Sequence, residues 1–213
     1  MLLLVVPLTA CLLAPRPDLY GGTTFSSAWF DRDGQLLRLG LAADQRYRLR
    51  VGLEGVAPVM QQATLLYEDQ DFYRHDGVDI TALLRAAWQT WVVAERRIGG
   101  STLTMQLARL RYRLPHTLWG KLQQIVRAWQ IERHYSKSRI LTAYFNLAPY
   151  GRNIEGVAAA SLVYFDKPAS ELTLPEALSL SVLPQNPVKR NPTTERGRKE
   201  LFAARSRLFD RWL

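Results

Sequence analysis

From Pro58 to the end of the chain, apolar residues recur every three or four positions almost without interruption. An α-helix completes a turn every 3.6 residues, so this spacing gathers the apolar side chains on one helix face. Capping residues and prolines predict helix starts at Pro58, Asp79, Ser101 and Pro175. Further apolar repeats predict helices around residues 122–129, 140–145 and 201–212. In the first of these, the repeat leaves Lys121, Gln124 and Arg127 on the more polar side. The sequence therefore predicts a mainly α fold.

The segment before this region is typical of strands rather than helices. Two apolar runs, residues 23–30 and 35–41, flank the sequence Asp31–Gly34. An Asp-Gly step between two such runs indicates a β-hairpin. We therefore expect residues 15–51 to form a linker and a small hairpin, and residues 52–213 to form one helical domain.

Residues 1–14, MLLLVVPLTACLLA, are apolar throughout. The segment is shorter than the about 20 residues that a membrane-spanning helix needs. No Lys or Arg precedes it in the chain, so it lacks the charged start of a signal peptide. A truncated membrane anchor is favoured over a secretory signal. Leu8–Cys11 also resembles a lipoprotein cleavage box, and the alternative is that Cys11 is simply buried in an anchor.

The chain is basic, with 28 Lys and Arg against 19 Asp and Glu and a net charge of +9. Such a charge favours polyanions or anionic membranes as partners. The arginines are scattered from Arg16 to Arg211 without a nucleic-acid motif, so we expect no nucleic acid partner. Cys11 is the only cysteine and the three histidines lack metal-ligand spacing, so no metal site is expected.

Residues 68–77, EDQDFYRHDG, concentrate ionisable groups between two predicted helices. Glu68 falls at the C-terminal end of its helix beside Asp69 and Asp71, where the helix dipole and the like charges should raise its pKa. A carboxylate with a raised pKa suits a general base working near neutral pH. The alternative is a solvated acidic helix end, with His75 a structural residue. Phe72 is expected in the core under either interpretation.

Residues 99–109, GGSTLTMQLAR, place two glycines and two hydroxyl residues at a helix start. The free backbone N–H groups of a helix N-terminus bind anions, and Arg109 follows about two turns later. A phosphate-bearing substrate would suit this arrangement. Ser101 can equally serve only as the helix N-cap.

Three patterns occur in order along the chain: ED-x-x-F-x-x-H-x-G, G-x-S-T-x-T-x-Q and S-K-x-x-I-L-x-x-Y-x-N. Together with the sequence from Gly120 to Pro187, they resemble the glycosyltransferase family of class A penicillin-binding proteins and monofunctional peptidoglycan glycosyltransferases. The resemblance covers roughly Gly52 to Leu213 and is strongest to the C subtype of class A.

The resemblance implies a lysozyme-like glycosyltransferase domain that polymerises lipid II into peptidoglycan strands with inversion and releases undecaprenyl diphosphate. It implies that Glu68 is the catalytic base, deprotonating the acceptor 4-hydroxyl. Catalytic support would come from Asp69, Phe72, His75 and Gln124. The residues implied to bind substrate and diphosphate are Ser101, Thr102, Gln106, Arg109, Lys121, Lys137 and Asn146.

Gln124 departs from the family pattern, because it stands where the third motif usually has a second glutamate. An amide binds a cation more weakly than a carboxylate and cannot donate a proton as an acid. Glu132, eight residues later, would sit about 80° around the helix and is a poor direct substitute. We therefore expect no required cofactor, and at most a weak role for Mg²⁺ or Mn²⁺.

Two other functions remain open. Gln124 is compatible with a catalytically weak or silent module that binds lipid II or glycan, and a lysozyme-like fold is compatible with a peptidoglycan hydrolase. The resemblance further implies a role in cell-wall biogenesis and cell shape, with the catalytic domain on the periplasmic face of the bacterial inner membrane. Partners would be lipid II, the growing glycan strand, and a transpeptidase domain or other cell-wall synthesis proteins.

Overall fold

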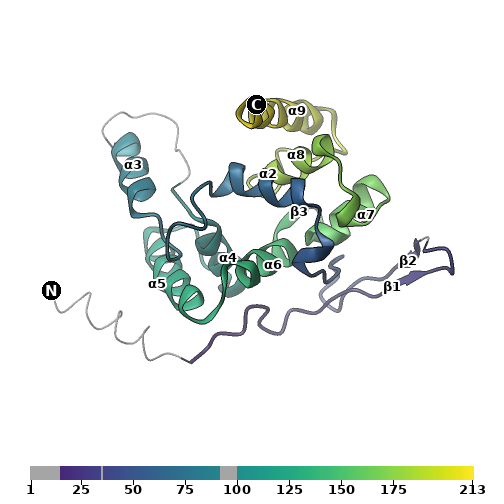
Figure 1. The fold of residues 1–213 in the computed structure, drawn as a ribbon, viewed down its shortest axis with the longest axis horizontal. Helices are drawn as coiled ribbons and strands as arrows, with labels where there is room; N and C mark the ends of the chain where they lie inside the picture. Colours follow the sequence, from purple (N-terminus) through teal and green to yellow (C-terminus); the bar gives the residue numbers. More distant parts are fainter. Residues whose placement is uncertain (1–14, 35, 92–99) are drawn as a thin grey trace. The chain divides into compact units, whose positions relative to one another are not determined.

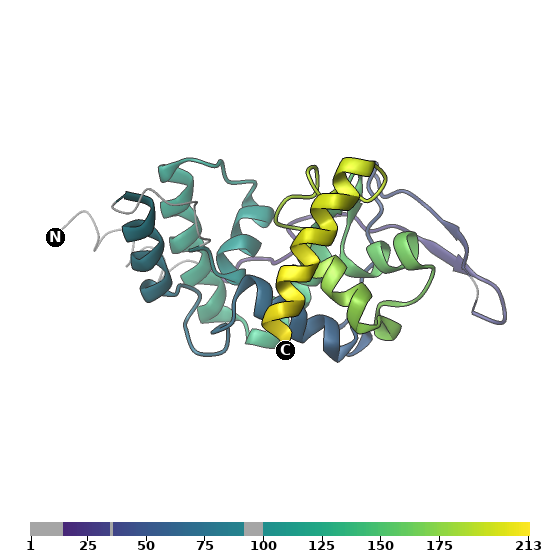
Figure 2. The same ribbon diagram turned by 90° about the horizontal axis from the view of Figure 1, so that it is seen from above.

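The computed structural model describes residues 15–34, 36–91 and 100–213. Within these ranges the fold is mainly helical, with two small antiparallel sheets of two strands each (Figures 1 and 2). The prediction of a mainly α fold with a β-hairpin is therefore confirmed.

Tertiary contacts divide the chain into two compact units. The first consists of Glu68–Leu141 together with the chain up to Gly21, and the second consists of Gly22–Tyr67 and Thr142–Leu213. Neither unit is a continuous segment of the sequence. The predicted domain boundary between residues 51 and 52 stays a prediction.

The first unit is built from helices α3 (Ile80–Trp91), α4 (Leu103–Tyr112) and α5 (Leu118–His134), followed by the start of α6 (Lys137–Leu147). Its core includes Val78, Met105 and Ala128, with Ile125 and Trp129 of α5 packed against them. Because these residues come from three segments far apart in sequence, apolar burial holds α4 and α5 beside the chain that follows Glu68.

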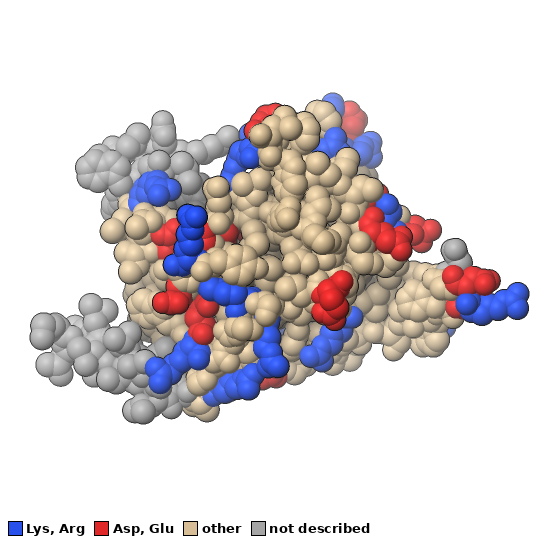
Figure 3. Space-filling view, viewed as in Figure 1, with Lys and Arg blue, Asp and Glu red and all other residues tan. Residues whose placement is uncertain are grey.

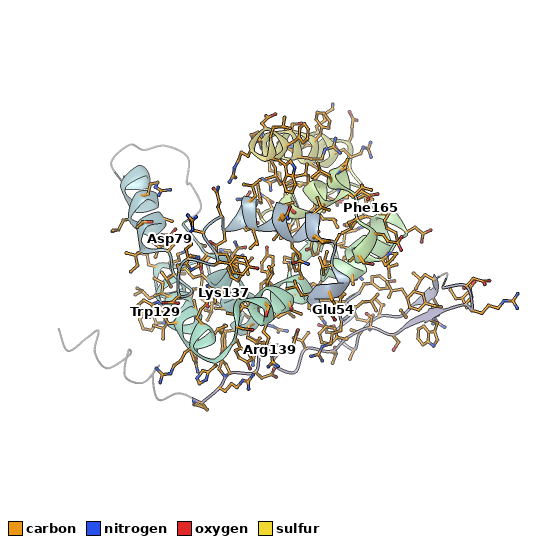
Figure 4. The ribbon with its side chains drawn as sticks, in the orientation of Figure 1. Glu54, Asp79, Trp129, Lys137, Arg139 and Phe165 are labelled. Atoms are coloured by element: carbon orange, nitrogen blue, oxygen red, sulfur yellow. The ribbon has the colours of Figure 1, made fainter. Side chains whose placement is uncertain are left out.

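Two helix starts in this unit can be compared with their predictions. Asp79 caps α3 as predicted, since its Oδ1 accepts a hydrogen bond from the backbone N–H of Ala82 at 2.9 Å (Figure 4). Helix α4 is capped by Thr102 and not by Ser101, because the Thr102 side chain accepts from the Met105 N–H at 3.2 Å. The prediction of Ser101 as the N-cap was wrong by one residue.

The second unit contains the helical segments η1 (Leu53–Gly55), α2 (Pro58–Glu68, of which Glu68 belongs to the first unit), α7 (Val157–Phe165), η2 (Ala169–Glu171), α8 (Leu174–Val182) and α9 (Glu195–Trp212). Helices α8 and α9 lie side by side in Figures 1 and 2. A capping box formed by Thr173 and Glu176 starts α8, with Pro175 in its first turn as predicted. Local capping signals therefore locate this helix correctly.

The predicted hairpin is present in the second unit. Strand β1 (Ala28–Phe30) pairs antiparallel with β2 (Leu36–Leu39). The turn is closed by a hydrogen bond from the Gly34 N–H to the Asp31 carbonyl at 3.2 Å, with Gly34 at φ +80°. A positive φ favours glycine, which explains the Asp-Gly signal. Acidic and basic side chains, including Arg32 and Asp33, lie together near the hairpin tip (Figure 3).

A second small sheet was missed by sequence reasoning. Strands β3 (Pro149–Gly151) and β4 (Ile154–Glu155) form an antiparallel pair. The sequence signals at Pro149 and Gly151 predicted only the end of a helix. Glu155 of β4 accepts hydrogen bonds from Arg46 and from the buried Arg48, so partners about a hundred residues earlier in the chain stabilise this turn.

No helix within the described residues is both long and apolar enough to cross a bilayer. The predicted anchor or signal segment, residues 1–14, lies outside the described residues.

Candidate active site

Glu68 is the last residue of α2, and its Oε2 accepts a hydrogen bond from Gln106 Nε2 of α4 at 2.7 Å. The acidic stretch and the Gly-Ser-Thr stretch were predicted to form one site from separate parts of the sequence. This contact joins the two stretches directly through the side chains assigned to the base and to substrate binding.

Asp69 is buried and uses both carboxylate oxygens. Oδ2 accepts from the Leu103 N–H at 2.8 Å, and Oδ1 bonds His75 Nε2 at 2.9 Å. The helix dipole favours negative charge at an N-terminus, so this carboxylate stabilises the first turn of α4. Asp69, which directly follows Glu68, therefore attaches the acidic stretch to the start of α4.

Thr102 closes the loop that begins at Asp69. Its Oγ1 donates to the Gly77 carbonyl at 2.6 Å while accepting from the Met105 N–H. Phe72 in the middle of this loop is fully buried, as predicted. The loop of residues 69–77 is thus fixed at both of its ends to the start of α4.

Ser101 before α4, Arg109 of α4 and Lys121 of α5 form a polar cluster. Lys121 of α5 donates a hydrogen bond to Ser101 Oγ. Arg109, near the end of α4, lies 3.3 Å from both ring nitrogens of His116. Burial of the Lys121 ammonium and its repulsion by Arg109 lower the pKa of Lys121 to about 8. An anion beside these two cations would be stabilised by both.

Gln124 lies on the buried face of α5. The sequence predicts that Gln124 lies with Lys121 and Arg127 on the polar side of the helix, but Gln124 is only 6% exposed. Gly120, Ala128 and Ile131 are also buried and share its side of the helix at helical spacing. The predicted polar position of Gln124 was therefore wrong, because Ala128 on this side of α5 packs in the core with Met105 of α4.

Lys137 is directed into the protein from the start of α6 (Figure 4). Its ammonium donates to Glu132 Oε1 at 2.8 Å and to the His75 carbonyl at 2.5 Å. The same ammonium lies 4.5 Å from the centre of the Phe72 ring. The diphosphate contact implied for Lys137 stays a prediction, since in this structure Lys137 bonds the loop and α5.

Sequence reasoning considered Glu132 only as a replacement for Gln124 and did not consider Thr104. Thr104 Oγ1 of α4 donates to Glu132 Oε1 at 2.6 Å. One sequence signal could have identified Glu132, because it is the only acidic residue in the sequence of α5, which is otherwise basic or neutral.

Asn146 belongs to the second unit and is fully buried. Its Nδ2 donates to the carbonyls of Val51 and Thr142, and its Oδ1 accepts from the Val51 N–H, each at 2.8 Å. These bonds hold the chain before η1 against α6. The substrate contact implied for Asn146 stays a prediction, since the observed contacts support the fold.

Within the described parts of the chain, no three His, Cys, Asp or Glu side chains are grouped closely enough to hold a metal ion. The expectation that any Mg²⁺ or Mn²⁺ role is weak rests on Gln124 and stays a prediction.

Comparisons with known proteins define the class to which this chain belongs. The family described as Transglycosylase matches residues 32–211, and the chain belongs to this family. Penicillin-binding protein 1C of Escherichia coli strain K12 is 42% identical over 180 residues, which are 84% of this chain and 23% of that protein.

Two further relatives show the same pattern of coverage. Penicillin-binding protein 4 of Bacillus subtilis strain 168 is 33% identical, over 78% of this chain and 27% of that protein. Penicillin-binding protein 1A of Neisseria gonorrhoeae is 35% identical, over 81% and 21%. The chain thus spans about a quarter of the length of these curated relatives. A crystal structure of penicillin-binding protein 1A from Haemophilus influenzae matches 89% of this chain and 18% of that chain, with a TM-score of 0.46 and 21% identity.

Proposed function

We propose that the chain is a peptidoglycan glycosyltransferase that polymerises lipid II into glycan strands and releases undecaprenyl diphosphate. The observation that carries the proposal is the Glu68–Gln106 hydrogen bond, which joins the first two family motifs in one site. Membership of the transglycosylase family supports the same reaction class.

In the proposed reaction Glu68 removes the proton from the 4-hydroxyl of the acceptor sugar as that oxygen attacks the anomeric carbon of the donor. The new glycosidic C–O bond forms while the bond from the anomeric carbon to the diphosphate breaks. The bonding electron pair leaves with the diphosphate oxygen, and attack from the opposite face inverts the anomeric carbon. A general base of this kind contributes about 10²- to 10⁴-fold to the rate.

The leaving diphosphate needs positive charge more than it needs a proton. Lys121 and Arg109 supply cationic groups, and Lys121 bonds Ser101. We assign donor binding to these three residues, with Thr102 and Gln106 positioning the start of α4 and the base. Asp69, Phe72 and His75 then support the base by holding the loop that follows it.

A polymerisation assay with labelled lipid II tests the proposal. Glu68→Gln keeps a side-chain oxygen for the Gln106 bond but cannot accept a proton, so strand synthesis should fall by about 10²- to 10⁴-fold with little change in unfolding temperature. Glu195→Gln, at an exposed position of α9, is the matched control and should retain wild-type activity. Wild-type turnover in the Glu68→Gln protein would remove the base assignment.

A silent lipid II-binding module is the second candidate, and the amide of Gln124 favours it. In that case the wild-type protein and Glu68→Gln would bind lipid II equally and neither would form polymer. A peptidoglycan hydrolase would instead solubilise purified cell-wall sacculi. We place it last because the cations at Arg109 and Lys121 suit a charged leaving group better than a neutral glycosidic bond.

We place the protein at the bacterial inner membrane with its catalytic part on the periplasmic face. Support comes from large apolar side chains exposed on the first turns of α5, where Leu118 is 81% and Trp119 is 67% exposed. An exposed apolar group of this kind marks an interaction surface, and the net charge of +9 favours anionic lipid. A transpeptidase domain or another cell-wall synthesis protein is the proposed partner in the complete assembly.

A further inference from the structure

A buried carboxylate lies next to the proposed active site without a part in the proposed reaction. The Glu132 side chain is 8% exposed, and its Oε1 accepts two hydrogen bonds, from Thr104 Oγ1 at 2.6 Å and from Lys137 Nζ at 2.8 Å. Burying a charge is costly unless it is paired and hydrogen-bonded. Here both conditions are met, and the pair links α4, α5 and α6.

The partner of this carboxylate reaches the loop that carries Asp69 and His75. Besides Glu132, the Lys137 ammonium bonds the His75 carbonyl at 2.5 Å and lies 4.5 Å from the centre of the Phe72 ring. An ammonium has three donors and attracts the face of an aromatic ring. Lys137 therefore holds the loop at two residues, His75 and Phe72.

The loop also rests directly on Glu132 at its far end. Gly77 has φ +83°, and a Cβ at this position would lie 2.7 Å from Glu132 Cγ and 3.0 Å from the Ala128 carbonyl oxygen. Only glycine permits so close an approach. Glu132 therefore contacts the loop in two ways. Its side-chain Cγ packs against Gly77, and its carboxylate pairs with the Lys137 ammonium that bonds His75.

We propose that Glu132 is a positioning residue of the active site: through Lys137 it fixes the loop of residues 69–77 and thereby the carboxylate of Glu68. This role rests on the glycosyltransferase function proposed above. It also gives Lys137 a positioning role in place of a contact with the diphosphate. Since a misplacement of about 1 Å can lower a rate by about 10²-fold, a loosened loop should slow the chemical step.

The test is a double-mutant cycle on the full chain with Glu132→Gln and Lys137→Met, measured by lipid II polymerisation. Glu132→Gln removes the negative charge that neutralises the Lys137 ammonium, and Lys137→Met leaves the Glu132 carboxylate without its cation. Each single variant should therefore lower kcat about tenfold while KM for lipid II changes by less than about twofold. The double variant removes both charges together, so its kcat should fall about tenfold and not about a hundredfold.

The split between kcat and KM separates positioning from direct donor binding. A raised KM for Lys137→Met, with unchanged kcat for Glu132→Gln, would assign Lys137 to the diphosphate and overturn the proposal. A hundredfold loss in the double variant would also overturn it, because it would show that the two residues act independently. Thermal unfolding of each variant confirms that the measured protein is folded.

The exposed pair Glu195 and Lys199 on α9 provides the matched control, with side chains 75% and 78% exposed. The double variant Glu195→Gln/Lys199→Met should leave kcat and KM unchanged. An inactive wild-type protein would overturn the proposed function, whereas an active wild-type protein with fully active Glu132→Gln would overturn the positioning role alone.

Discussion

At the scale of single residues, Lys121 has a charge that pH can control in the neutral to mildly alkaline range. Burial disfavours its ammonium, and the charge of Arg109 disfavours it further, so its pKa falls to about 8 from the usual 10.5. Between these two values an unfolded chain binds more protons at Lys121 than the folded chain does. The contribution of Lys121 to stability should therefore rise as pH increases from about 8 to 10.5.

Donor capture should show the opposite trend with pH. Below about pH 8 Lys121 is charged and attracts diphosphate, and above it the charge is lost, so kcat/KM for lipid II should fall as pH rises through about 8. Lys121→Arg carries a charge that persists to higher pH and should abolish this fall. An unchanged profile in Lys121→Arg would show that another group causes the pH dependence.

Gln124 leads to a prediction about divalent cations. Because an amide is a weak cation ligand, chelation of Mg²⁺ and Mn²⁺ should change the rate of strand synthesis by less than about twofold. Gln124→Glu restores the carboxylate of the family pattern and should make the rate more sensitive to the chelator. Since residue 124 is buried, the added charge should also lower the unfolding temperature of the Gln124→Glu protein. Strong Mg²⁺ dependence of the wild-type protein would contradict the expectation.

At the scale of elements, the start of α4 is both capped by Thr102 and bonded to the loop that follows Glu68. Thr102 caps α4 and also donates to the Gly77 carbonyl, 25 residues earlier in the chain. Thr194 caps α9 by accepting from the Gly197 N–H at 3.1 Å and donates to the Asn191 carbonyl, three residues earlier, at 3.3 Å. Both caps are threonines, but only Thr102 also bonds a distant segment, the loop of residues 69–77.

Thr102→Ala should therefore be more damaging than Thr194→Ala. Loss of a cap alone costs about 1 kcal/mol in the free energy of unfolding. Loss of the additional buried bond to Gly77 should bring the cost for Thr102→Ala to about 2–3 kcal/mol. Urea unfolding followed by circular dichroism measures both values, and only Thr102→Ala should also reduce strand synthesis. Equal destabilisation would show that the Gly77 bond contributes nothing.

At the scale of the whole molecule, the excess of basic residues and the exposed apolar start of α5 both favour a membrane surface. Attraction between basic residues and anionic lipid is screened by salt, whereas apolar contacts are not. The two contributions can therefore be separated by ionic strength.

The full chain should co-sediment with vesicles containing anionic lipid, and less so as salt increases. Leu118→Ser/Trp119→Ser should weaken the binding that remains at high salt. Val188→Ser, at an exposed apolar position in the second unit, is the control and should bind as the wild type does. Retention of full binding by the double variant would exclude the start of α5 as the contact.

The sequence alone determined most of the helices and the β1–β2 hairpin. Helical periodicity, the cap at Asp79, the first-turn Pro175 and the Asp-Gly turn are local signals, because each depends on residues within one or two turns of chain. The family resemblance implied roles for Glu68 and Gln106, which stay predictions, and the structure shows a hydrogen bond between the two side chains.

Only the tertiary structure decided which way several side chains point and what they bond. Gln124 is buried on the side of α5 where Ala128 packs with Met105 of α4. Asn146 bonds Val51 and Lys137 bonds the His75 carbonyl, and both partners lie far away in the sequence. The role of Glu132 likewise depends on α4, α6 and Gly77 meeting around it. Periodicity specifies a helix and its apolar face, but burial of a polar side chain depends on partners that are chosen only when the helices pack.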